Sequence, residues 1–370
     1  MRTDICEALG IERPIFAFTP SEHVAAAVTR AGGLGVLGCV RFNDAEELDA
    51  TLDWMDANTD GKPYGIDVVM PAAVPTEGKA MDLDAMIPAE HRAFVDRTLA
   101  DLGVPPLDTS VEHASGVLGW LHSVARAQVD VALKHRPALI ANALGSPPKD
   151  VIDEAHAVGV QVAALAGAVR HAHSHVDNGV DIVIAQGYEA GGHTGEIASM
   201  VLVPEIVDAV GDRATVLAAG GIGSGRQIAA AMALGAEGVW MGSYWLTAAE
   251  YQLGSAAGEG PSVIQKALLE ATSADTVRTR IYSGKPARLL KTKWTEAWEA
   301  KDAPDALPMP LQNILVAEAH QRISAADDPS VVAMPAGQIV GRMNEIVPVA
   351  DSMAALVAEY EATVARLSKL

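Results

Sequence analysis

The sequence predicts an α/β fold of the TIM type, a (β/α)8 barrel with a helical insertion and a C-terminal helical lid region. Three features support this: eight short segments rich in β-branched residues, continuous apolar character in several of them, and a helix-length stretch between most neighbours. Strands that are buried on both faces of a parallel sheet read as apolar runs. Eight such strands alternating with helices match a barrel, and a doubly wound open sheet is the alternative.

The predicted strands follow one another along the first two-thirds of the chain. They are Ile15–Phe18, Gly35–Val40, Tyr64–Met70, Ala138–Ala143, Gln161–Leu165, Asp181–Gln186, Thr215–Ala219 and Gly238–Met241. Crossover helices are expected at His23–Ala31, Ala45–Asn58, Pro148–Ala157, Val169–Asn178, Val203–Val210 and Ser224–Leu234. Each can return the chain to the start of the next parallel strand.

Two stretches are longer than a crossover needs. Helical patterns near residues 76–134 predict an insertion in a barrel that spans residues 1–250. Residues 251–335 hold further helix candidates and a Pro-rich connector, which predicts a helical lid or substrate region. Residues 336–370 end in a strongly helical stretch, which we expect to pack on the barrel.

Composition excludes several classes of partner. Asp plus Glu number 47 against 27 Lys plus Arg, a net charge of −20, which repels nucleic acid and anionic lipid. Cys6 and Cys39 have neither metal-ligand spacing nor the density of a disulfide framework, so both are expected to be free thiols. The chain shows no signal-peptide pattern and no apolar run of about 18 residues, so we expect a cytoplasmic protein without a membrane partner.

Glycines follow the last two predicted strands. Gly220 and Gly221 come after the seventh strand, just before a helix that opens near Ser224, and Gly242 and Ser243 come after the eighth. Bare N–H groups at such turns and at a helix start bind phosphate. Phosphate loops after strands seven and eight recur in TIM barrels, which favours a phosphate site over simple tight turns.

The GGIGSG sequence is not a dinucleotide fingerprint. Arg226 occupies the position of the third glycine when the motif starts at Gly221, and Ile228 occupies it when the motif starts at Gly223. A Rossmann-type site is therefore excluded.

The sixth predicted strand ends in AQGYEAGGHTG, residues 185–195, which offers Gln186, Glu189 and His193 in one turn. Catalytic residues of TIM barrels lie at the carboxyl ends of strands, and imidazole transfers protons near neutral pH. The alternative is a loop histidine bonded to its own backbone. The glycine-rich loop beside a phosphate site favours a catalytic His193.

These motifs, with VLAAGGIGSG and MGSYWL, resemble the nitronate monooxygenase family of FMN-dependent barrels. RPIFAF, PYGIDVVMP, TVRTRIYSGKPARLLKT and PAGQIVG extend the resemblance over both ends and most of the middle of the chain. It implies bound FMN, a catalytic His193 and a Gln338 near the site. The cofactor contacts that it implies are Ala17, Phe18, Thr19, Asp67, Gln186, Gly191, Gly220, Gly221, Met241, Gly242 and Ser243.

Two positions depart from the family pattern. Phe18-Thr19 stands where a Pro-Met pair is usual, and Asp67 stands where Asn is common. An ionised carboxylate cannot donate a hydrogen bond, and it would disfavour an anionic reduced flavin. These departures leave the substrate open.

The resemblance implies oxidation of alkyl nitronates, or of nitroalkanes, by dioxygen to a carbonyl compound and nitrite. One alternative is an NAD(P)H-dependent flavin reductase acting on a quinone or an enoyl thioester. Another is a non-redox TIM-barrel enzyme acting on a phosphorylated substrate, which usually needs a strand-end Lys or Glu. The oligomeric state is left open between a monomer and a homodimer.

Two weaker clusters have simpler explanations. His171, His173 and His175 lie on a predicted helix, where only the first and third share a face, so we expect a surface helix and no metal. Arg278, Arg280, Lys285 and Arg288 form a basic island, for which a locally bonded turn is favoured over attraction of an anion. Separately, Trp294 and Trp298 are spaced i, i+4 and are expected to pack together.

Overall fold

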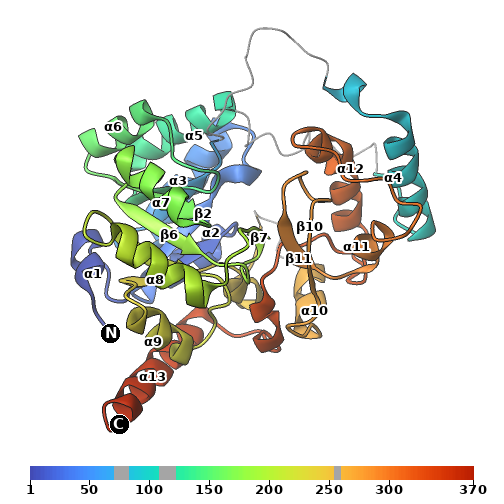
Figure 1. The fold of residues 1–370 in the computed structure, drawn as a ribbon. Helices are drawn as coiled ribbons and strands as arrows, with labels where there is room; N and C mark the ends of the chain where they lie inside the picture. The colour runs from blue at the N-terminus through green and yellow to red at the C-terminus, as the bar shows by residue number, and fades with distance from the viewer. Residues whose placement is uncertain (71–82, 108–121, 254–259) are drawn as a thin grey trace.

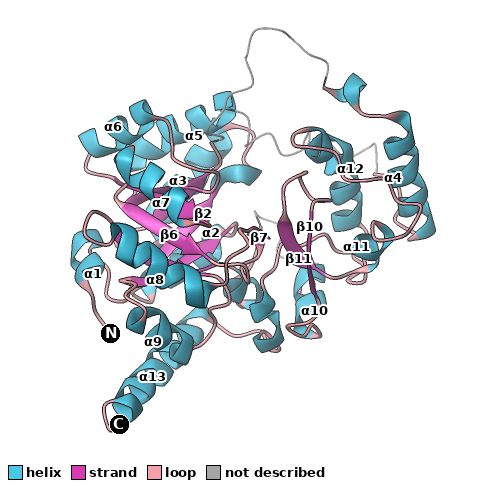
Figure 2. Ribbon diagram, viewed as in Figure 1, coloured by secondary structure: helices cyan, strands magenta, loops and turns pink. Residues whose placement is uncertain are grey.

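A computed structural model describes residues 1–70, 83–107, 122–253 and 260–370 (Figures 1 and 2). Its centre is a closed barrel of parallel strands in the order β1-β2-β3-β4-β5-β6-β8-β9, with β9 pairing back onto β1. The barrel strands are β1 (Ile15–Thr19), β2 (Leu34–Gly38), β3 (Gly65–Val68), β4 (Leu139–Asn142), β5 (Gln161–Ala166), β6 (Ile182–Gln186), β8 (Thr215–Ala219) and β9 (Gly238–Met241). The predicted TIM barrel is confirmed, and the open doubly wound sheet is wrong because this sheet closes.

All eight predicted strands coincide with barrel strands. β8 and β9 match their predicted bounds, and the others differ by one or two residues at an end. Val40, predicted as strand, lies instead in the short helix η1 (Cys39–Arg41). Continuous apolar runs therefore predicted where the strands lie, but they predicted the ends of the strands less accurately.

Helices cover the outer face of the barrel. They are α2 (Glu22–Arg30), α3 (Ala45–Asn58), α5 (His122–His135), α6 (Lys149–Ala157), α7 (Val169–Asp177), α8 (Ser199–Val210) and α9 (Gly225–Ala233). α2 lies so close to β2 that a Cβ on Gly35 would stand 1.9 Å from the Ala25 carbonyl oxygen, so only glycine fits there. α8 begins one turn earlier than predicted, because the Glu189 carboxylate accepts from the Ser199 N–H and satisfies the helix start.

The barrel interior is filled by side chains from alternate positions of the strands, including Phe16, Val36 and Leu217. Helix α1 (Asp4–Leu9) adds Ile5 and Cys6 to the same cluster. It covers the end at which the strands begin, so the opposite, carboxyl end is left for a site. Both cysteines are free, as predicted, and both are buried.

A second cluster of helices stands beside the barrel in Figure 1. It contains α4 (Ala89–Asp101), α11 (Lys293–Ala297) and α12 (Leu311–Ala325), whose buried side chains form one apolar core. Trp294 and Trp298 pack there with ring centroids 6.0 Å apart, which confirms the predicted pair. Within the predicted insertion, α4 packs against α12 whereas α5 packs against α3 on the barrel. The domain boundaries at residues 250 and 335 stay a prediction.

A small antiparallel sheet lies between the two parts, in the order β10-β11-β7. Its strands are β10 (Thr276–Thr279), β11 (Ala287–Leu290) and β7 (Gly192–His193). The sequence did not predict these strands, since each is at most four residues long and without an extended apolar run. The loop that carries His193, residues 187–195 (called the histidine loop below), is therefore paired to a distant part of the chain.

The remaining elements complete the chain. They are η2 (Asp84–Met86), η3 (Ser243–Thr247), α10 (Val263–Leu269), η4 (Gln338–Arg342) and α13 (Val349–Leu367). α13 packs against α9 and α2, where its Glu359 carboxylate accepts from the Gly225 N–H at 2.8 Å. Among the described residues, no helix has both the length and the apolar character that crossing a membrane requires.

Candidate active site

The turn after β8 presents bare backbone N–H groups. Gly220 and Gly221 have φ of 103° and 66°, values that favour glycine. The Gln227 side chain accepts from the Gly223 N–H at 3.0 Å and donates to the Gly221 carbonyl, which fixes the turn. Within the described chain, the N–H groups of Gly220 and Gly221 donate to no protein acceptor. They are thus available to an anion.

The turn after β9 lies next to it, because β8 and β9 are paired neighbours. Ser243 Oγ accepts from the Gly337 N–H at 2.9 Å, so its own hydroxyl proton remains free to donate. No acceptor for the Gly242 N–H occurs in the ranges that the structure describes. Two adjacent strand ends therefore offer the donor set that a phosphate group binds.

Phe18 forms an apolar floor beside these turns. Its ring stacks on Trp240 with centroids 6.3 Å apart, and a Cβ on Gly242 would be 3.5 Å from it. Ala17 and Met241 instead direct their side chains into the outer core, so neither can offer a side chain to the mouth. Thr19 is buried, and its hydroxyl oxygen accepts from the Ser21 N–H.

The loop after β6 is held against the chain at residues 336–338. A Cβ on Gly191 would lie 2.7 Å from the Gly337 nitrogen, so the close approach requires glycine. The Gln338 N–H donates to the Glu189 carbonyl at 2.9 Å. Gln186 ends β6 opposite Ala219, and its partly buried side chain is on the inner side of the barrel. These predicted residues are thus brought to one end of the barrel.

His193 is held in place by β11 and by the turn between β10 and β11. It lies on β7 opposite Ala287 of β11, and its Nε2 is 2.6 Å from Ser283 Oγ. The Lys285 N–H donates to the same oxygen at 3.3 Å. Burial, with a smaller contribution from the Lys285 charge, lowers the pKa of His193 to about 4. The imidazole is therefore neutral near pH 7, and Nδ1 has no partner among the described residues.

Two arginines of the basic island hold the histidine loop. Arg288 is 2% exposed and donates to the Tyr188 carbonyl, while Arg278 donates to the Thr194 hydroxyl and carbonyl. Their guanidinium groups lie 4.5 Å and 5.7 Å from the centroid of the Tyr188 ring. The favoured prediction of a locally bonded turn holds for this pair, whereas Arg280 and Lys285 are exposed.

Asp67 lies inside the barrel near the same end. It is 3% exposed, and burial raises its pKa well above the usual value for a carboxyl group. The ionised carboxylate expected from the sequence is therefore not the form that this site favours. The cause is the apolar surrounding, which a single sequence position does not reveal.

The histidines of α7 need a correction. His175 is buried, not on the surface, with Nδ1 at 2.7 Å from Ser146 Oγ and Nε2 at 3.0 Å from the Leu165 carbonyl. Both nitrogens are occupied, so His175 ties α7 to the barrel. His173 is exposed on the opposite side.

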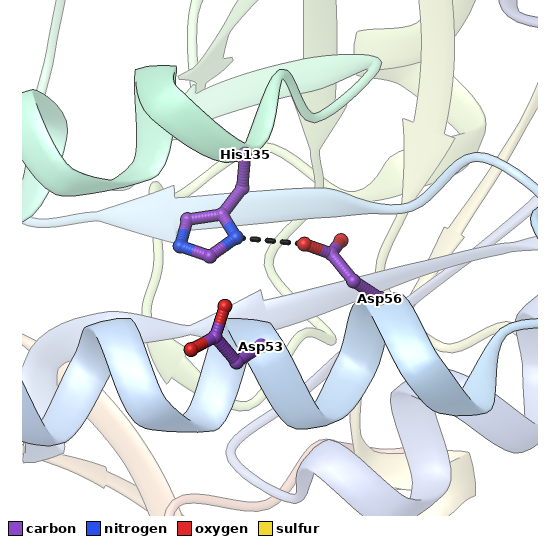
Figure 3. A group of neighbouring side chains, drawn as sticks. All are labelled: Asp53, Asp56 and His135. Atoms are coloured by element: carbon purple, nitrogen blue, oxygen red, sulfur yellow. Dashed lines mark hydrogen bonds and ion pairs between the residues drawn. The ribbon is translucent and has the colours of Figure 1, made fainter.

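A separate group of possible metal ligands lies between α3 and α5: Asp53, Asp56 and His135 (Figure 3). His135 Nδ1 is 2.7 Å from an Asp56 oxygen, and Nε2 is 3.0 Å from an Asp49 oxygen. Burial alone would lower the pKa of His135, but the two carboxylates outweigh it and raise the pKa. These contacts with Asp56 and Asp49 occupy both ring nitrogens of His135.

Two residues near His193 were missed by the sequence reasoning. Ser283 and Lys285 reach it from the turn between β10 and β11, 90 residues downstream in the case of Ser283. The basic island marked this segment, but no pattern linked it to the histidine loop. Only the pairing of β7 with β11 does so.

The closed parallel barrel, with two glycine turns that carry unpaired N–H groups and a histidine loop at its carboxyl end, defines a class of (β/α)8-barrel enzymes. Within that class, the nitronate monooxygenase family matches residues 8–359, and the chain belongs to this family. It is therefore an oxidoreductase of a family that is in general flavin-dependent.

Individual relatives agree with this assignment. A Mycobacterium tuberculosis protein provisionally described as a monooxygenase is 46% identical over 383 residues, covering 100% of this chain and 99% of that protein. Nitroalkane oxidase from Streptomyces ansochromogenes is 25% identical with a TM-score of 0.80, covering 98% of this chain and 99% of its own. FabK from Thermotoga maritima is 27% identical with a TM-score of 0.74, covering 100% and 99%.

Proposed function

We propose that this protein binds FMN and oxidises alkyl nitronates, with dioxygen as co-substrate, to a carbonyl compound and nitrite. The observation that carries the proposal is the neutral, partly buried His193 on the loop whose residues Glu189 and Ala190 pack against Gly220 and Gly221, where the N–H groups are unpaired. Membership of the nitronate monooxygenase family and the likeness to nitroalkane oxidase support it.

The donor set at the carboxyl end of the barrel suits FMN. Gly220, Gly221, Gly242 and Ser243 would hold the phosphate with backbone N–H groups and one hydroxyl. Phe18 would offer an apolar surface to a flat ring system. Gln186 and Asp67 would meet the ring from the ends of β6 and β3, and Gly191 from the loop after β6, while Ala17, Thr19 and Met241 could contribute backbone atoms only. Bound FMN supplies the electron transfer, and the chain supplies position and electrostatics.

His193 would act as a base when the substrate is a neutral nitroalkane. Its unpaired Nδ1 can accept the α-proton, while Ser283 holds the ring through Nε2. The resulting imidazolium is disfavoured by burial and by Lys285 in the free protein. The nitronate formed in the same step is an anion, and it would stabilise both cations by direct attraction.

The NAD(P)H-dependent reductase remains the second candidate. FabK resembles this chain almost as closely as nitroalkane oxidase does, with TM-scores of 0.74 and 0.80. The shape of the barrel therefore does not separate the two activities, and the reductant must be tested directly.

Two measurements test the proposal. The purified protein should be yellow, with flavin absorbance maxima, and acid should release one FMN per chain. A colourless protein that stays colourless after incubation with FMN would favour the non-redox alternative. Anaerobic mixing with propionate 3-nitronate should then bleach the flavin absorbance, while NADPH should not. Bleaching by NADPH alone would refute the nitronate assignment and support the reductase.

A further inference from the structure

Asp67 is an acidic side chain in an apolar layer of the barrel. Its neighbours along β3, Ile66 and Val68, pack in the outer core, so alternation directs Asp67 to the inside. Its paired neighbours on β2 and β4 are Gly38 and Ala141, and the Phe18 ring fills the space beside Gly38, where a Cβ would stand 3.0 Å from it. The side chain therefore points into the barrel near its carboxyl end.

The carboxyl group has no partner in the part of the chain that the structure describes. Among the described residues, no hydrogen bond or ion pair involves the Asp67 side chain, although the residue is only 3% exposed. The atoms are not fully sealed, since neither oxygen is among the completely buried unpaired polar atoms. A buried carboxyl without a partner is costly unless it is neutral and finds a hydrogen bond.

The groups around Asp67 do not favour its charge. Cys39 lies next to it in η1, and burial and Asp67 raise the pKa of that thiol far above its usual value. Arg41, further along η1, pairs instead with Glu22 at 2.8 Å. On β4, the Asn142 amide is committed to backbone groups. Nothing in this described surrounding supplies a cation to a carboxylate.

We infer that Asp67 is held as a neutral carboxylic acid whose O–H donates a hydrogen bond to an acceptor atom of the bound flavin ring. This inference rests on the proposed FMN site. The oxidised flavin ring presents two carbonyl oxygens and the unprotonated nitrogens N1 and N5, and these acceptor atoms attract a donor and repel a carboxylate. A protonated acid thus does the work of an amide donor, so the acidic residue is compatible with a flavin site.

The first test does not depend on the cofactor. Infrared difference spectra of the apo protein, wild type against Asp67→Asn, should show the carbonyl band of a protonated carboxylic acid at pH 7, absent from the variant. A matched variant of an exposed residue, Asp153→Asn, should retain the band. Absence of the band from the wild type would overturn the inference, whatever the protein binds.

The second test measures FMN binding by flavin fluorescence between pH 6 and 10. Asp67→Asn should bind FMN within about threefold of the wild type, because the amide still donates. Asp67→Leu should bind roughly five- to tenfold more weakly, the usual effect of one neutral hydrogen bond. At the alkaline pH values where the infrared band of the acid disappears, the wild type should bind FMN more weakly than Asp67→Asn does.

Two results would contradict the donor role: binding by Asp67→Leu as tight as that of the wild type, or equal weakening in the Asn and Leu variants. Melting temperatures of both variants show whether a loss comes from unfolding. If the acid band is present but neither the wild type nor any variant binds FMN, the proposed cofactor and the donor role fail together. The protonation of Asp67 then stands.

Discussion

Replacement of His193 by Asn tests the proposed base. Asn keeps a polar side chain near Ser283 but cannot accept the α-proton, so turnover of a neutral nitroalkane should fall roughly 10²–10⁴-fold. Turnover of a pre-formed nitronate should fall less, because its α-proton has already gone. FMN content should be unchanged, since the glycine turns proposed to hold the phosphate follow β8 and β9.

The pH profile adds a second check. With its pKa lowered to about 4, the wild-type imidazole is neutral at pH 7, so kcat/KM for nitroalkanes should stay flat from pH 6 to 8 as far as His193 decides it. It should fall as the pH drops through about 4 to 5 and the base is protonated. Oxygen uptake and nitrite release measure both substrates, and His173→Asn on the exposed side of α7 is the control.

Other outcomes have definite meanings. Equal losses on both substrates would mean that His193 anchors the anion and does not remove the proton. No loss on either would refute the catalytic assignment and leave the hydrogen bond to Ser283 a purely structural contact.

Three further predictions concern the cofactor and the fold. Gly221→Val should abolish FMN binding while far-UV circular dichroism stays unchanged, because φ of 66° strains a β-branched residue in the turn. Asn142→Leu should lower the free energy of unfolding in urea by roughly 3–5 kcal/mol, since it removes three hydrogen bonds, two of them buried, and orphans their backbone partners. The pKa of His135 is raised above 6.5, so its ion pairs stabilise the fold fully below pH 6.5 and less as the pH rises through the raised value. Asp56→Asn should therefore flatten the fall in melting temperature between pH 6 and 9.

These three have clear contrary results. Normal FMN content in Gly221→Val would remove the phosphate-turn argument, and a cost below about 1 kcal/mol for Asn142→Leu would mean that water replaces the amide. An unchanged pH dependence in Asp56→Asn would show that Asp49 alone holds His135.

The sequence was informative where structure depends on local pattern. Apolar runs located the strands, and the placement of His193, Gly220 and Gly242 at strand ends followed from them. The sequence could also predict that the Ala17 side chain points out of the barrel, since Ala17 alternates with the inward-facing Phe16 and Phe18 along β1. The resemblance alone did not separate side-chain from backbone contacts.

Local sequence patterns could not predict contacts between segments that are distant along the chain. The pairing of β7 with β11 and the bond from Ser283 to His193 join positions about 90 residues apart. The protonation of Asp67 depends on the strands that surround it, and the buried position of His175 depends on the packing of α7. Each is set by tertiary structure and not by neighbours in the chain.

The pairing of β7 with β11 also fixes the order in which the protein can become competent during its synthesis. A growing chain that has completed β9 at Met241 already holds every strand of the barrel, yet it lacks Ser283 and Ala287. The imidazole of such a nascent barrel has neither its hydrogen-bond partner nor its neighbouring strand. The surroundings of the proposed base are therefore complete only after β11 has been synthesised and has paired with β7.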